Sequence, residues 1–271
     1  MSALSELLSA PRRLSKLHLE EGALYVSLNR PQQRNALNQA LVRELSALFD
    51  ALTLAPPPEI RVVVLRGEGE HFCAGGDVRD MSGASPEELK KMNRAFGSLL
   101  QQLTACPLPI IAALEGVVMG GGVGLACAAD LSLSLEGVRF KLPEVSLGLT
   151  PAQITPFVVR KVGVSVTKRL ALTGVELSGE QAQACGLVDE HHLTRATYKE
   201  ALEALIMSLK RGAPRALGLT KQLIERSSIT SEEHLDELLD EASERFSEQC
   251  RGEAQEGLAA LRERRAPLWR A

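Results

Sequence analysis

The segment from Pro109 to Gly163 decides the fold and reads PIIAALEGVVMGGGVGLACAADLSLSLEGVRFKLPEVSLGLTPAQITPFVVRKVG. It opens with an apolar run, Pro109 to Leu114, that has the length and residue types of a buried strand. Three glycines, Gly120 to Gly122, then open an apolar segment rich in alanine and leucine, Val123 to Ala129, which we predict to be a helix. A strand, a glycine turn and a helix N-terminus together direct free backbone N–H groups and the positive end of a helix dipole towards an anion.

An earlier segment repeats this arrangement. The run RVVVL, Arg61 to Leu65, predicts a strand, and GEGEHFCAGGD follows it with Gly75 and Gly76 just before Asp77. Glycine lets a ligand approach the backbone closely because it has no Cβ. Two strand ends with exposed glycine N–H groups could converge on one carbonyl oxygen, which is how an oxyanion hole is built.

Three motifs in this order, FCAGGD, GVVMGGGVGLACAAD and LPEVSLGLTP, carry a resemblance to a known family. With these spacings the chain resembles the enoyl-CoA hydratase/isomerase (crotonase) family, from NRPQQRNALN near the start to EGLAALRERRAPLW at the end. The resemblance implies an α/β fold, a crotonase-like spiral of ββα turns. Residues 1–190 would form the core with the active site, and residues 191–271 a C-terminal helical region for trimerisation and completion of the CoA site.

The composition is that of an ordinary globular protein. The chain has 271 residues, of which 45 % are apolar and 24 % charged, enough for one large or two small domains. A net charge of −3 gives no indication of nucleic-acid or anionic-membrane binding. Five scattered cysteines without a CxxC pair favour free thiols in a reducing compartment and predict no metal site. We find no apolar run near the length of a membrane span and no signal-peptide order of residues, so we expect a cytoplasmic protein.

Hydrophobic periodicity and glycine or proline punctuation predict the remaining elements. We expect a loose leader up to Ala10, and a β-hairpin over Leu14 to Leu28 that turns at Gly22. Alternation of strands and helices through Leu149 implies stacked βα units, and an all-helical region follows. The predicted helices are Gln39 to Leu54, Pro86 to Leu103, Pro156 to Leu172, Ser178 to Cys185, Thr197 to Arg211, Ala213 to Glu225, Ser231 to Glu248 and Gly252 to Arg265.

The family resemblance assigns catalytic roles to three residues. It implies an acyl-CoA thioester substrate whose carbonyl oxygen accepts hydrogen bonds from the N–H groups of Gly76 and Gly121. Glu144 matches one of the two glutamates of the family's hydratases. Because its neighbours, such as Leu142 and Val145, are apolar, we expect partial desolvation to raise the pKa of Glu144. A surface or salt-bridged glutamate is the alternative interpretation.

The chain departs from the family at the second glutamate. The two-glutamate hydratases carry it just after the glycine cluster, where Gly124 stands here. Two readings remain: a Δ3-Δ2 enoyl-CoA isomerase that uses Glu144 alone, or a hydratase in which Gly124 opens room for a larger or branched acyl chain. An inactive acyl-CoA-binding member of the fold is a third, although Glu144 and the oxyanion glycines argue against it.

A longer string, LPEVSLGLTPAQITPFVVRKVG, favours hydration. It resembles the isohexenylglutaconyl-CoA hydratases of bacterial acyclic-terpene breakdown, which act on a 3-branched glutaconyl thioester. The sequence AQIT, Ala152 to Thr155, stands where the family commonly has glycines and suggests a reshaped pocket. Gln153 can donate and accept hydrogen bonds, so it could orient water or a distal carboxylate, or satisfy loop backbone.

The remaining candidate residues would bind substrate. The resemblance places Arg34 and Ala36 at the CoA nucleotide end, although Arg34 is equally a solvated loop charge. It also places Ala74, Asp77 and Val78 along the substrate, with Asp77 capping or bracing its turn rather than catalysing. Two further sets complete the predictions: Met92 and Phe96, which line the acyl pocket or form a core stripe, and Arg262, Arg264 and Arg265, which reach the CoA phosphates or form a solvated helix face.

The resemblance also implies partners and cofactors. The family forms trimers that often pair into hexamers, so we expect a homotrimer or hexamer. We expect no cofactor beyond the coenzyme A that is part of the substrate, because the sequence has no metal-ligand cluster and no GxGxxG dinucleotide fingerprint.

Overall fold

Two β-sheets organise the chain in the computed structural model, which describes residues 3–270. The larger sheet has six strands in the order β1-β2-β3-β4-β6-β9, and the smaller has three in the order β5-β7-β8. In the larger sheet β1 and β2 pair antiparallel as the expected hairpin, and all other neighbours are parallel. The strands are β1 (Ser15–Glu20), β2 (Ala23–Leu28), β3 (Val62–Gly67), β4 (Ile110–Leu114), β5 (Val117–Met119), β6 (Leu131–Leu135), β7 (Arg139–Lys141), β8 (Leu177–Ser178) and β9 (Glu190–His192).

The helices follow the sequence pattern closely, with ends that differ from the predicted ones by a few residues. Several ends have evident local causes: Asn38 caps α2, and Ser85 with Glu88 forms a capping box at the start of α4. The helices are α1 (Ala3–Ser9), α2 (Gln39–Leu54), α3 (Val78–Met81), α4 (Pro86–Ala105), α5 (Gly121–Ala128), α6 (Thr155–Thr173), α7 (Gly179–Ala184), α8 (Arg195–Lys210), α9 (Pro214–Ser227), α10 (Leu235–Cys250) and α11 (Glu253–Glu263).

The chain winds between the two sheets as a spiral. From β4 in the larger sheet it passes to β5 in the smaller sheet and then to α5, and from β6 it passes likewise to β7. Because β4 pairs with β6 and β5 pairs with β7, each turn stacks on the one before it. The predicted α/β fold with a spiral of ββα turns is therefore confirmed.

The predicted loose leader is wrong for the described residues of that segment. Residues 3 to 9 form α1, and Leu7 is 8 % exposed within the main core. Arg12 fixes the end of this helix by donating a hydrogen bond of 2.7 Å from Nη1 to the Leu7 carbonyl oxygen. The pattern was missed because seven residues are too few for helical periodicity to show.

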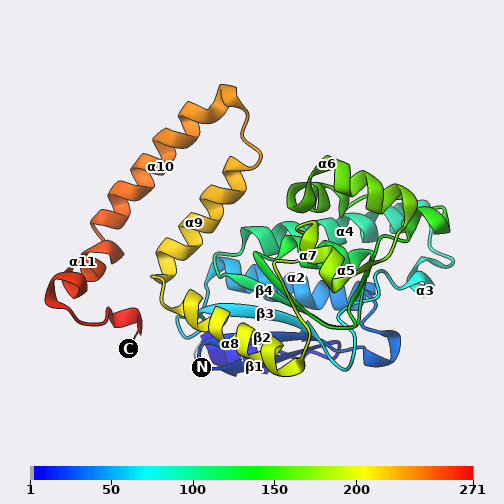
Figure 1. Cartoon of the computed structure of the whole chain (residues 1–271), viewed down its shortest axis with the longest axis horizontal. Coiled ribbons are helices and arrows are strands. Elements are labelled where there is room, and N and C mark those ends of the chain that lie inside the picture. Colours follow the sequence, from blue (N-terminus) through cyan, green and yellow to red (C-terminus); the bar gives the residue numbers. More distant parts are fainter. Residues whose placement is uncertain (1–2, 271) are drawn as a thin grey trace.

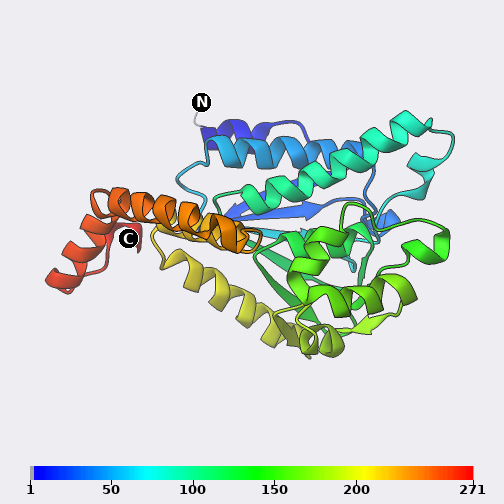
Figure 2. The same cartoon turned by 90° about the horizontal axis from the view of Figure 1, so that it is seen from above.

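Helices cover both faces of the larger sheet, and this divides the core in two (Figure 2). On one face α2 and α4 pack their apolar sides through residues such as Leu45, Phe49 and Leu99. On the other face α8 packs through Tyr198 and Ile206. No helix within residues 3–270 is both long and apolar enough to cross a bilayer.

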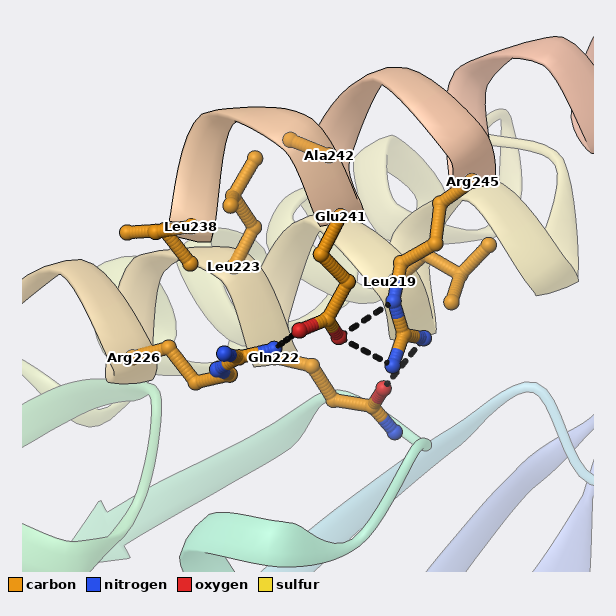
Figure 3. Close-up of a pocket in the computed structure, with 8 residues that line it drawn as sticks. All are labelled: Leu219, Gln222, Leu223, Arg226, Leu238, Glu241, Ala242 and Arg245. Atoms are coloured by element: carbon orange, nitrogen blue, oxygen red, sulfur yellow. Dashed lines mark hydrogen bonds and ion pairs between the residues drawn. The ribbon is translucent and has the colours of Figure 1, made fainter. Parts of the chain in front are cut away.

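The helices α9 and α10 form a hairpin that stands away from the sheets (Figure 1). Figure 3 shows Glu241 of α10 between Arg226 of α9 and Arg245 of its own helix, with hydrogen bonds from both guanidinium groups. These ion pairs lie beside Leu219 and Leu238, so charge and apolar contact together hold the two helices.

Lys221 ties α9 to the core. Its ammonium group is buried and donates to the Leu103 carbonyl oxygen at 3.0 Å, and its Nζ lies 2.9 Å from Oδ2 of Asp130. The same Oδ2 accepts a hydrogen bond of 2.6 Å from the backbone N–H of Ile110 at the start of β4. One cation therefore joins the C-terminal helices, the end of α4 and the strand that leads to the glycine turn.

We predict that Lys221→Met destabilises the fold by about 3 kcal/mol, because Asp130 then stays buried without its counter-charge. Urea unfolding followed by circular dichroism measures the change in free energy of unfolding. Lys168→Met, on the exposed side of α6, is the matched control and should change it by less than about 0.5 kcal/mol. An unchanged midpoint for Lys221→Met would show that this ion pair does not hold α9.

Candidate active site

Two glycine-containing loops lie side by side at the carboxyl ends of β3 and β4. Backbone hydrogen bonds join them: Phe72 N–H donates to Glu115 at 2.8 Å, and Cys73 N–H donates to Val117 at 3.0 Å. Met119 N–H returns a bond of 2.9 Å to the Cys73 carbonyl oxygen. The two segments predicted to converge therefore do so, through their own main chains.

Glycine is required at the point of closest approach. Gly75 and Gly120 have φ angles of +94° and +49°, which L side chains rarely adopt. A Cβ on Gly75 would lie 3.0 Å from the Met119 carbonyl oxygen and 3.6 Å from the Gly121 nitrogen. The loops can thus approach to backbone contact only without side chains here.

The N–H groups of Gly76 and Gly121 are free. Within residues 3–270 neither donates a hydrogen bond to a protein acceptor. Gly121 is the first residue of α5, whose preceding residue Gly120 supplies no side-chain cap, so the amide also lies at the positive end of the helix dipole. Two free donors on adjoining loops can bind one developing oxyanion.

Glu144 lies against these loops. It begins a 3₁₀ turn over Glu144–Leu147, and its Oε1 lies 2.8 Å from where a Cβ of Gly120 would stand. Its Oε2 is buried and has no hydrogen-bond partner among the residues that the structure describes. Burial raises the pKa of Glu144 above its ordinary value, and a hydrogen bond from its own backbone N–H opposes the shift.

The predicted direction of this pKa shift is confirmed, but its predicted cause is only partly right. Leu142 is buried, whereas Val145, Leu147 and Leu149 are exposed. The desolvation therefore does not come from the apolar neighbours in sequence as a group. The glycine turn against which Glu144 lies contributes to it, and within the described chain no ion pair to Glu144 opposes the shift.

The space expected beside Gly124 is filled. A Cβ on Gly124 would collide with Cγ2 of Ile154 and would lie 3.5 Å from Cδ1 of Leu100. Ile154 is 3 % exposed and precedes α6, so an apolar side chain from a distant segment covers this face of α5. The expectation that Gly124 opens room for an acyl chain is therefore wrong at this position.

The sequence profile of the enoyl-CoA hydratase/isomerase family matches residues 18–271. The chain belongs to this family. The crystal structure of Pseudomonas aeruginosa AtuE is 42 % identical, covers 96 % of this chain and 100 % of that one, and superposes with a TM-score of 0.91. An enoyl-CoA hydratase/isomerase from Marinobacter aquaeolei is 37 % identical with a TM-score of 0.89, over 95 % and 99 % of the two chains. The 2,3-dehydroadipyl-CoA hydratase of Escherichia coli K12 is 32 % identical over 92 % of this chain and 95 % of its own.

Of the predicted acyl-pocket residues, the structure brings Phe96 to the oxyanion loops. Its Cζ lies 3.2 Å from where a Cβ of Gly121 would stand, and Leu37 contacts the same point at 2.9 Å. Met92, one helical turn earlier, is half-buried. Gln153 packs on Gly97 of α4 and donates from Nε2 to Oδ1 of Asn93 at 2.9 Å, so this hydrogen bond goes to a side chain rather than to loop backbone.

Asp77 braces its turn, as predicted. It caps α3 by accepting from Arg79 N–H, and its carboxylate also pairs with the Arg30 guanidinium at 2.8 Å. The hydrogen bonds from Arg79 and Arg30 hold the pKa of Asp77 well below its usual range, against the opposing effect of burial. A permanently ionised, doubly paired carboxylate positions the loop and is a poor proton shuttle.

The turn predicted to hold the CoA nucleotide end adjoins the same loop. The Arg34 carbonyl accepts from Ala74 N–H at 2.9 Å, and the carbonyl of Ala36 accepts from Arg30. The Arg34 side chain is exposed, and Val78 is 60 % exposed, so both are accessible from solvent.

The three C-terminal arginines differ in availability. Arg265 is paired with Glu256 and Glu263 at 2.6 Å each, whereas Arg262 and Arg264 are exposed and form no ion pair within residues 3–270.

Sequence reasoning missed three residues that shape the site. Asn35 is buried with a φ of +57°, and its Nδ2 donates to the carbonyls of Glu68 and His71 at 3.0 and 2.6 Å. Arg30 pairs with Asp77 across the same turn, and Ile154 fills the face of α5. Asparagine tolerates a left-handed turn, so NRPQQRN carried a detectable signal for Asn35, but nothing local marks the other two. Within the described range no group of histidine, cysteine or acidic side chains could hold a metal ion.

We predict that Gly124→Ala destabilises the fold although alanine favours helix by about 1 kcal/mol, because the collision with Ile154 costs about 1–3 kcal/mol. Ile154→Ala alone should also destabilise, through a cavity. In the double variant the new methyl group occupies that cavity, so the two losses should not add. Urea unfolding of the four proteins measures this coupling, and additive losses would show that the two side chains do not compete for one space.

Proposed function

We propose that this chain adds water to a 2-enoyl-CoA thioester, most specifically one with a 3-branched glutaconyl acyl group. The observation that carries the proposal is the juxtaposition of the half-buried Glu144 carboxylate, whose Oε2 is buried without a hydrogen-bond partner among the described residues, with two loops whose glycine N–H groups are free. Family membership supplies the thioester, and the geometry supplies a place for its carbonyl oxygen and a base beside it.

In this proposal Gly76 and Gly121 donate hydrogen bonds to the thioester oxygen. Negative charge grows on that oxygen as water attacks C3 and an enolate forms, so the two donors bind the transition state more tightly than the substrate. Their positions are fixed by the hydrogen bonds between the loops, and no reorganisation is needed when the charge develops.

Glu144 alone moves the proton. Its carboxylate takes a proton from the attacking water, the hydroxyl oxygen bonds to C3, and the same carboxyl group then returns a proton to C2 of the enolate. A raised pKa suits this double role, because it makes the carboxylate a stronger base towards the attacking water. Ile154 fills the space beside Gly124, which leaves no room there for a second carboxylate.

Two similarities to known enzymes support the proposed 3-branched glutaconyl acyl group. The string LPEVSLGLTPAQITPFVVRKVG resembles the isohexenylglutaconyl-CoA hydratases, and the name of the E. coli relative describes the hydration of another dicarboxylic acyl thioester. Gln153 and Asn93, hydrogen-bonded to each other on the α4 side, are polar groups that could meet a distal carboxylate. The alternative is isomerisation of the double bond by Glu144, which also needs only one carboxylate.

The deciding measurement is mass spectrometry of the protein with 3-methylglutaconyl-CoA, a longer isohexenyl analogue and crotonyl-CoA in deuterated water. We expect one water to add to the branched glutaconyl thioesters. Deuterium uptake or migration of the double bond without added water would identify an isomerase instead. If none of the three thioesters changes, the proposed substrate class is wrong.

We further predict that Glu144→Gln lowers turnover at least 100-fold while binding of the thioester persists. Because the folded protein raises the pKa of Glu144, ionisation of this group destabilises the fold as pH rises past its ordinary value of about 4.3. The variant should therefore be more stable than wild type at pH 7 and equally stable at low pH. Glu59→Gln, on an exposed loop, is the control, and an active Glu144→Gln protein would refute the assignment.

The same proposal includes association through α9, α10 and α11. These helices expose Ile224, Phe246 and Leu261 by 63, 68 and 75 % in the single chain, an apolar surface that a homotrimer would cover. We expect light scattering to give the mass of a trimer or hexamer, and Phe246→Glu with Leu261→Glu to lower it to that of a monomer. Leu172→Glu, equally exposed on α6, should leave the mass unchanged, and a monomeric wild type would contradict this part of the proposal.

A further inference from the structure

A second cleft lies on the opposite face of the sheet, between α8 and the carboxyl ends of β3 and β4. It has a volume of about 290 Å³, close to the lower end of small-molecule sites. The side chains considered below are those of Arg66, Glu68, Glu115, Arg195, Tyr198 and Lys199. Figure 2 shows α8 across the sheet from α2 and α4, and α4 supplies Phe96 to the candidate active site, so the α8 cleft lies on the other face of the sheet.

The α8 cleft has more cations than carboxylates, and its carboxylates are already paired. Glu115 accepts two hydrogen bonds from Arg195, at 2.6 and 3.1 Å, and Glu68 pairs with Lys16 at 3.0 Å. Arg66 and Lys199 have no carboxylate within ion-pair distance in the part of the chain that the structure describes. Two cations of the cleft therefore form no ion pair there, although Glu68 lies near enough to Arg66 to interact with it electrostatically.

Arg66 is held in place without being neutralised. Its Nε donates to Oγ of Ser27 at 3.0 Å, and its guanidinium carbon lies 4.9 Å from the centre of the Tyr25 ring. Both contacts fix the side chain while its terminal nitrogens form no hydrogen bond with another described residue. A positioned guanidinium of this kind binds an oxyanion with little loss of side-chain entropy.

The hydroxyl group of Tyr198 is a further polar group of the cleft without a hydrogen-bond partner among the described residues. Tyr198 itself is 3 % exposed. Burial and then Glu115 raise the pKa of Tyr198, against Arg195 and Arg66, so the hydroxyl stays a neutral donor. The apolar side chains of Ala113 and Leu202 also line the cleft, and Phe72, whose side chain is buried in the core on the other face of the sheet, borders it.

We propose that the α8 cleft binds a small organic carboxylate, with its oxyanion between Arg66 and Lys199 and a short apolar body against Ala113 and Leu202. The apolar lining favours an organic acid over inorganic phosphate, which has no apolar body to bury. This site is independent of the reaction proposed above, since it lies on the other face of the sheet.

A ligand in the α8 cleft would lie next to residues that lead into both oxyanion loops. Phe72 borders the cleft and leads directly into the loop that carries Gly76, and Glu115 leads into the turn that carries Gly121. The two segments are hydrogen-bonded to each other at this point, Phe72 N–H to the Glu115 carbonyl. Binding should therefore slow amide hydrogen exchange in both segments, which gives a readout that does not depend on turnover.

The experiment is isothermal titration calorimetry with butyrate, in the presence of saturating coenzyme A so that the family's own substrate site is filled. We expect a dissociation constant on the order of 1 mM. Lys199→Gln should weaken binding at least tenfold, and Arg66→Gln likewise. Lys168→Gln, an exposed lysine without a partner on α6, should bind as wild type does.

Hydrogen exchange then locates the site. Protection by butyrate of segments 66–76 and 115–121, together with 195–202 of α8, supports the proposal if it is lost in Lys199→Gln. Three results would overturn it: no binding of butyrate up to 50-fold above the expected constant, equal binding by Lys199→Gln, or binding of inorganic phosphate in place of butyrate. Lys199 is exposed and forms no contact needed for folding, so its variant keeps the test valid if Arg66→Gln fails to fold.

Discussion

The hydrogen bonds between the segments Phe72–Gly76 and Glu115–Gly121 are the constraint on which the site depends. Each loop leaves its own strand of the larger sheet, and only this main-chain pairing brings both glycine amides to one place. The pairing in turn requires Gly75 and Gly120, because any Cβ there would meet backbone or the Glu144 carboxylate. The direction of the free amides thus depends on the strand order and on these two glycines together.

The site is built from groups left without partners, and this has consequences for stability. A buried carboxylate oxygen without a partner among the described residues disfavours the folded state relative to a satisfied group, whereas the free amides of Gly76 and Gly121 lie at an exposed and a half-buried residue. Nearby, the structure places satisfied polar groups in the same loops: Asp77 with two arginines, and Asn35 with two carbonyls. The hydrogen bonds of Asp77 and Asn35 fix the loop, and the fixed loop keeps the groups without partners in position for a ligand.

The sequence alone predicted what depends on local pattern. Periodicity and capping residues predicted strand β4, helix α5, helix α2 (Gln39–Leu54) and helix α4, which begins with a proline. The observed bounds of these elements agree with the predicted ones to within a few residues. The direction of the pKa shift of Glu144 was also predicted, although most of the apolar neighbours to which the sequence attributes it are exposed. What could not be predicted are contacts between distant segments, such as Gln153 with Asn93, because no local signal specifies which side chains meet across two helices.

Ile154 shows why a glycine in place of a larger residue does not by itself indicate free space. A glycine at position 124 suggests vacant space when only its own segment is considered, yet the space belongs to whichever side chain the fold brings there. Here that side chain is a buried isoleucine thirty positions later, in contact with Leu100 as well as with α5. The position where the family's second carboxylate would stand is therefore covered by an apolar side chain, and Glu144 is left as the one carboxylate of the described chain against the glycine turn. A single glutamate in drier surroundings has a higher pKa, which is the condition under which one carboxyl group can act in turn as base and as acid.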